Sequence, residues 1–145
     1  MADQESLYEE IRREHEELRV LLGTVHRTLG ERSETVTHVS EMLESLRDHV
    51  ETHFTEEETD GFFDDVAARA PRVTDRTNEL RNEHKLLLQN IRKLADTASS
   101  GDGSSDWWQR LDNEFHDFSK ELMHHESKET ELLQDVYTDD IGAAD

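Results

Sequence analysis

Apolar residues recur at intervals of three and four along four stretches of the 145-residue chain, and this spacing constrains the fold more than any other feature. A period of about 3.6 residues places such side chains on one face of an α-helix, so each stretch predicts a helix with one buried face. Gly30, the segment 61–71 and the Ser- and Gly-rich loop 99–105 separate the stretches. The predicted helices span about residues 6–29, 34–60, 74–98 and 106–136, and Ser33 is the expected cap of the second.

Four amphipathic helices with short connections predict an all-α fold, an antiparallel up-down-up-down four-helix bundle. The chain is long enough for one domain with a real core, and we expect a single domain over residues 1–145. Only 32% of the residues are hydrophobic and 36% are charged, which alone is typical of disorder. The apolar periodicity and the single Pro favour long helices instead.

Charge and composition exclude several classes of function. A formal net charge of −20 disfavours nucleic acid and anionic membranes as partners, and it is typical of a solvated helical surface. Without Cys, the chain has no disulfide, thiolate metal site or cysteine nucleophile. No apolar run approaches the roughly 20 residues of a membrane-spanning helix, and the acidic N-terminal residues differ from a secretory signal. We therefore expect a cytoplasmic protein.

Six polar residues interrupt the apolar stripes, and their pattern repeats in the two halves of the chain. Each half offers a lone His and then, on the next predicted helix, a His four residues before a Glu. The six are His15, His53, Glu57, His84, His125 and Glu129. Because residues at i and i+4 lie on one helix face, each His-x-x-x-Glu pair presents an imidazole and a carboxylate together.

Measured along the helices from the turns at Gly30 and Gly101, the six positions lie at similar heights in the bundle. A lone His on an apolar stripe is usually a satisfied core residue. Four imidazoles and two carboxylates at one level need a cation, because buried polar groups need partners and buried charges need pairing. The pattern therefore predicts a metal site with enough ligands for two metal ions.

Some neighbouring residues leave the ligand set open. His49, one turn before His53, is an additional ligand, a hydrogen-bond partner of a ligand, or a residue at the edge of the core. Glu126, next to His125, is a candidate hydrogen-bond partner of a ligand. Other candidates fit the stripes less well, namely His124, Glu56 and Glu58.

The chain resembles the hemerythrin-like (HHE cation-binding) family from about Tyr8 to Gly142. The matching segments are Glu14-His15-x-x-Leu18, His49-x-x-x-His53-Phe54-x-x-Glu57, Glu83-His84-x-x-Leu87 and His125-Glu126-x-x-Glu129. The resemblance implies a hemerythrin-like bundle that holds two Fe ions in a non-haem centre. It further implies that the two carboxylates and an oxo or hydroxo group bridge the irons, and that His residues bind them terminally.

The chain departs from the oxygen-carrying hemerythrins in two places. Those proteins have a His-x-x-x-His pair on the third helix, whereas Leu80 and Leu88 occupy the partner positions of His84 here. They also have Asp five residues after the His of the fourth helix, whereas Glu129 follows His125 at four. The pattern is more similar to hemerythrin-like proteins linked to oxygen or iron sensing and to the handling of oxidants than to a simple oxygen carrier.

Three functions remain open. The first is a di-iron protein that reacts with or senses O2, peroxide or NO, as a sensor, a sink or a weak peroxidase, with Phe54, Phe62 and Phe63 as the walls of its pocket. The second is a metal-dependent regulatory or adaptor bundle, or an iron-homeostasis module, that has no turnover and is read by an unknown protein partner. The third is a structural bundle that binds zinc or manganese, or no metal.

Overall fold

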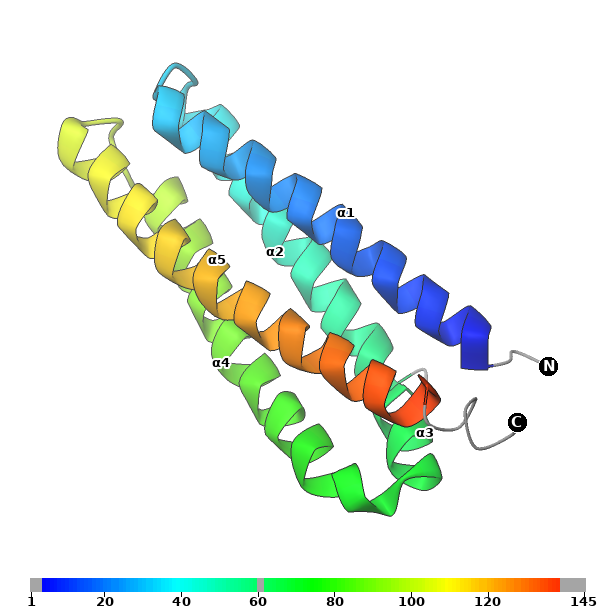
Figure 1. Cartoon of the computed structure of the whole chain (residues 1–145). Helices are drawn as coiled ribbons and strands as arrows, with labels where there is room; N and C mark the ends of the chain where they lie inside the picture. Colours follow the sequence, from blue (N-terminus) through cyan, green and yellow to red (C-terminus); the bar gives the residue numbers. More distant parts are fainter. Residues whose placement is uncertain (1–3, 60–61, 139–145) are drawn as a thin grey trace.

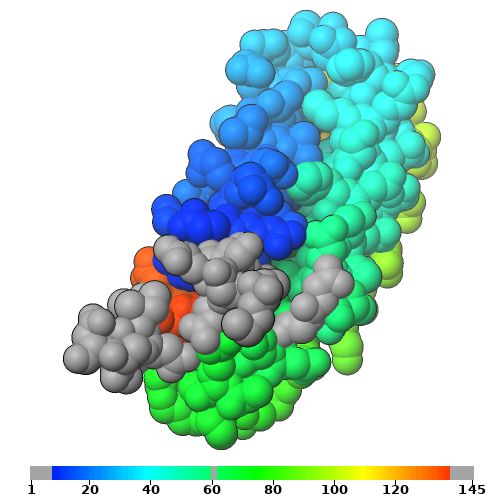
Figure 2. Space-filling model, turned by 90° about the vertical axis from the view of Figure 1, so that its right-hand side faces the viewer, coloured from blue at the N-terminus to red at the C-terminus, as the bar shows by residue number. Residues whose placement is uncertain are grey.

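Four long helices run antiparallel in a computed structural model that describes residues 4–59 and 62–138 (Figure 1). They are α1 (Gln4–Glu31), α2 (Val36–Thr59), α4 (Thr74–Ser99) and α5 (Ser105–Leu133). Each helix packs beside the next, and α5 also packs against α1, which closes the bundle. Figure 2 shows α1 and α2 side by side along one face of the molecule. The predicted all-α, up-down-up-down bundle is therefore confirmed.

Two apolar clusters fill the bundle, one on each side of a polar layer. The larger cluster extends from Leu18, Leu87 and Leu122 to the connections at the far end of the bundle. The smaller cluster contains Ile11 and Leu80 and lies at the end where α1 begins and α5 ends. Among the described residues, α1, α4 and α5 contribute apolar side chains to both clusters, and α2 contributes to the larger one. The polar residues that interrupt or end these apolar stripes lie between the clusters.

The smaller cluster is covered by a short helix that the sequence pattern did not predict. Residues between the second and third predicted helices form α3 (Phe62–Arg69) and the 3-10 helix η1 (Pro71–Val73). The side chains of Phe62, Phe63 and Val66 are buried, so α3 closes this end of the bundle over the polar layer.

The end of α5 also differs from the prediction, since the helix ends at Leu133 and the chain continues as the π-helix η2 (Gln134–Thr138). Side-chain contacts hold η2 in place. Asp135 accepts hydrogen bonds from Arg76 at 2.7 Å and from Arg72 at 3.2 Å. The Tyr137 hydroxyl donates to Asp65 of α3 at 2.7 Å. These contacts join η2 to η1, α3 and α4.

The residues that cap the helices show where the observed helix boundaries differ from the predicted ones. Thr35, rather than the expected Ser33, caps α2, because its hydroxyl accepts a hydrogen bond from the backbone N–H of His38 at 3.1 Å. Ser104 caps α5 in the same way through the N–H of Trp107. Among the described helices, none has the length and apolar character needed to cross a lipid bilayer.

Candidate metal centre

The six polar residues predicted to form a site all lie in the layer between the two apolar clusters. The helix α1 carries one of them, α2 two, α4 one and α5 two, and no residue of the set is more than 4% exposed. Each of these residues takes the place of an apolar residue in the stripe of its helix. The apolar packing above and below the layer therefore fixes the height and direction of every member of the set.

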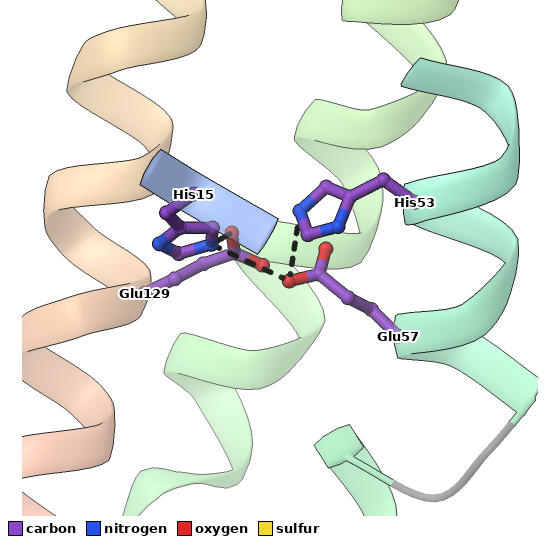
Figure 3. A group of neighbouring side chains, drawn as sticks. All are labelled: His15, His53, Glu57 and Glu129. Carbon is purple, nitrogen blue, oxygen red and sulfur yellow. Dashed lines mark ion pairs between the residues drawn. The ribbon is translucent and has the colours of Figure 1, made fainter. Parts of the chain in front are cut away.

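The ligating atoms form two groups that share both carboxylates. One group is His15, His53, Glu57 and Glu129, and the other is Glu57, His84, His125 and Glu129. Within each group, one nitrogen or oxygen atom per residue lies within 4.8 Å of the others. Figure 3 shows the first group, in which the carboxylates approach one another from opposite sides of the bundle. Two carboxylates shared by two pairs of imidazoles can bridge two adjacent cations.

Each imidazole directs its Nε2 atom at a carboxylate of the layer, at 3.1–3.5 Å. The pairs are His15 with Glu129, His84 with Glu57, His53 with Glu57, and His125 with Glu129. None of these contacts has hydrogen-bond geometry, and these nitrogens and carboxylate oxygens are buried without a hydrogen-bond partner among the described residues. Converging lone pairs of this kind are costly alone and suit a bound cation, so the residues fit a metal centre.

Three imidazoles hold their other ring nitrogen against a carboxylate from a neighbouring helix. The contacts join Nδ1 of His53 to Glu14 at 3.0 Å, Nδ1 of His84 to Glu58 at 3.2 Å, and Nδ1 of His125 to Glu83 at 2.7 Å. A carboxylate only accepts, so the proton of the neutral ring lies on Nδ1 and the Nε2 lone pair is free for a metal ion. Such contacts also fix the orientation of a metal-binding imidazole.

The Glu83 contact is reinforced by Lys128, which donates hydrogen bonds to Glu83 and, at 3.3 Å, to Glu79. Burial by itself would raise the pKa of Glu83, but the hydrogen bonds from Lys128 and His125 outweigh it and lower that pKa. Glu83 therefore stays ionised and remains an acceptor for His125.

The pKa values of the two shared carboxylates shift in opposite directions. Burial raises the pKa of Glu57 well above the usual range, and repulsion by Glu129 adds to this shift. Burial acts in the same direction on Glu129, but contacts with His125, His15 and His84 outweigh it and hold the pKa of Glu129 well below the usual range. Without a cation, the surrounding side chains therefore favour ionisation of only one of these two carboxyl groups. A cation bound between them would favour ionisation of the other as well.

Aromatic rings from both apolar clusters pack against the His84 imidazole. The ring of Phe54 stacks on His84, with centroids 3.9 Å apart and an angle of 8° between the planes. Phe63 lies 5.4 Å from the same imidazole, and Phe62 packs against Phe63 at 4.9 Å. Two of the three predicted wall residues, Phe54 and Phe63, therefore contact His84 directly, and Phe62 packs against Phe63.

The structure places the remaining candidates outside both groups. His49 is half-buried and lines a surface hollow of about 440 Å³ together with His53 and Glu14. Glu126 is 1% exposed, and burial raises its pKa to about 7. The stripe spacing disfavoured Glu58 as a ligand, and in the structure its carboxylate contacts the Nδ1 atom of His84 instead.

Fold and site together define a metal-binding four-helix-bundle protein. The sequence model of the Hemerythrin HHE cation binding domain matches residues 6–137, and the chain belongs to this family. No curated protein and no solved structure matches the chain. Membership implies that the domain binds a metal cation, and the two His/Glu groups are able to hold one.

Proposed function

We propose that the six buried residues bind two iron ions, and that the loaded protein reacts with or senses O2, peroxide or NO. The observation that carries this proposal is the sharing of both carboxylates by two pairs of imidazoles. A mixed imidazole and carboxylate donor set suits iron. Two ferrous ions, when bound, would supply the electrons and the open coordination positions that such small molecules require.

The side chains of the chain itself have three tasks in this proposal. The imidazoles and the two shared carboxylates hold and neutralise the cations, and the contacts of Glu14, Glu58 and Glu83 keep the Nε2 lone pairs available. Phe54 and Phe63 exclude water from the His84 side. His15, in contrast, also lines a surface hollow of about 500 Å³, which offers a small ligand a short path to the site.

The test is the metal content of protein purified without added metal, together with its absorption spectrum. We expect close to two irons per chain and a near-ultraviolet to visible band that bleaches with reductant and returns with O2 or peroxide. One zinc ion, or no metal after a careful reconstitution, would contradict the proposal. Two irons with a spectrum inert to every oxidant would favour the regulatory or adaptor module without turnover. The cytoplasmic location stays a prediction.

A further inference from the structure

The two halves of the chain place equivalent side chains around the shared carboxylates. His15 and His84 correspond, as do His53 with His125, and Glu57 with Glu129. The correspondence extends to the hydrogen bonds of the site. In each half, the Glu that precedes the lone His contacts Nδ1 of the other His, through Glu14 in one half and Glu83 in the other.

This correspondence fails at two positions, and both lie beside a lone His. His84 is stacked by Phe54 and has its Nδ1 atom 3.2 Å from Glu58. The residues at the same places in the sequence repeat, on the His15 side, are Glu126 in place of Phe54 and Thr130 in place of Glu58. A stacked aromatic ring on one side of the centre is therefore matched by a carboxylate on the other.

Glu126 is buried in a way that the protein alone does not compensate. Its side chain is 1% exposed, and neither of its oxygens has a hydrogen-bond partner among the described residues. Burying an unpaired carboxylate is strongly unfavourable. A cation bound nearby would stabilise the carboxylate of Glu126 in this position.

The helix geometry directs Glu126 toward the first of the two groups. Glu126 precedes Glu129 by three residues on α5, so the two side chains lie on neighbouring parts of one face. His125 lies on the other side of Glu129 on that face and contacts Glu83 of α4. Glu126 therefore lies on the side of α5 that packs against α1, where Oε1 of Glu129 is 3.3 Å from Nε2 of His15.

We propose that Glu126 is a third carboxylate of the metal centre, which binds the cation held by His15 and His53. The inference rests on the proposed two-cation site and makes its two positions unequal. The His84 position is closed by Phe54, and the group of possible ligands found there among the described residues includes the two shared carboxylates and no third one. The His15 position has the additional carboxyl group of Glu126 and the adjoining surface hollow.

The test is Co²⁺ binding to metal-free protein, followed by calorimetry and by the d–d absorption bands of the bound ion. Glu126→Gln keeps the shape of the side chain and removes its charge. We expect one of the two binding steps to weaken by roughly 10-fold or more and the other to stay unchanged. Glu126→Asp, which keeps the charge on a shorter stem, should weaken the same step less.

Glu114→Gln is the control, because Glu114 is a partly buried glutamate of α5 that also has an oxygen without a hydrogen-bond partner among the described residues and lies about three turns from the site. Both of its binding steps should equal those of the wild type. The melting temperature of metal-free Glu126→Gln should be equal to that of the wild type or higher, since an unpaired buried charge has been removed. If the variant is as stable as the wild type, weaker Co²⁺ binding reflects the loss of a metal ligand and not a loss of folded structure.

Two unchanged binding steps in Glu126→Gln, or two steps weakened equally, would overturn the proposal. A wild-type protein that binds one Co²⁺ or none would overturn the two-cation site and the role of Glu126 with it. A wild-type protein that binds two Co²⁺, but whose iron-loaded form is inert to oxidants, would contradict only the proposed reaction with O2, peroxide or NO.

Discussion

At the residue scale, the candidate centre depends on which ring nitrogen of each imidazole is protonated. We expect Glu14→Gln to weaken metal binding by roughly 10-fold or more, because an amide is a poorer acceptor for the Nδ1 proton of His53. Titration of metal-free protein with Co²⁺ measures the change. Glu17→Gln is the control, since Glu17 lines the same hollow as Glu14 but is exposed. Equal affinities in the two variants would contradict this role for Glu14.

A second prediction concerns the shared carboxylates. Glu57→Gln should abolish binding of both cations, because Glu57 belongs to both groups, whereas His53→Ala should weaken one binding step only. Metal-to-protein ratios after reconstitution and dialysis distinguish the two results. A Glu57→Gln protein that still binds two metal ions would show that this carboxylate does not bridge.

The sequence predicted the six residues because each replaces an apolar residue in a helical stripe. It did not predict the contacts of Glu14 and Glu83, although both precede a lone His. Each of them lies off the stripe of its own helix and contacts an imidazole on the neighbouring helix. A one-dimensional pattern contains the spacing along a helix, but it does not contain the side-chain contacts between helices.

At the scale of elements, the long helices followed from periodicity, and the short ones did not. The helix α3 has eight residues, too few to establish a 3.6-residue period, and η2 departs from α-helical geometry. Ser33 and Thr35 are chemically equivalent as caps, so the choice between them depends on where α2 begins.

The connection between α4 and α5 yields a prediction at a single glycine. A Cβ atom at Gly101 would lie 1.7 Å from Cδ1 of Trp107, whose buried indole donates a hydrogen bond to the carbonyl of Thr97. Gly101→Ala should lower the free energy of unfolding by about 1–3 kcal/mol, because the ring must move. Gly23→Ala, inside α1 with open space around it, should raise the free energy by about 0.5–1 kcal/mol. Urea denaturation measures both changes.

The link from η2 to η1 and α4 should depend on pH. Hydrogen bonds from Arg72 and Arg76 lower the pKa of Asp135 to about 2, from the usual 3.8. A lowered pKa in the folded state gives a stabilising contribution that is complete above the unfolded pKa and is lost as the pH falls through the folded value. The stability difference between wild type and Asp135→Asn should therefore be constant above about pH 4 and vanish near pH 2. A constant difference down to pH 2 would contradict this role for the contact.

At the scale of the whole molecule, metal binding and folding are linked. A cation that binds only the folded chain stabilises it, by about 2.7 kcal/mol when the free cation is at 100 times its Kd. Thermal unfolding of loaded protein, with and without a strong chelator, should therefore show a lower melting temperature after chelation. Glu57→Gln should melt at the same temperature in both conditions. A wild-type protein insensitive to the chelator would contradict a metal centre in this layer.

The two shared carboxylates should affect the rate at which the protein unfolds. Glu57 and Glu129 come from the two helical hairpins, so neither hairpin completes either group of ligands alone. The centre can form only after the hairpins dock, and interactions that form late in folding slow unfolding more than they speed folding. A bound cation should therefore slow unfolding by holding the two hairpins together. It does so against the repulsion that a net charge of −20 creates within the chain.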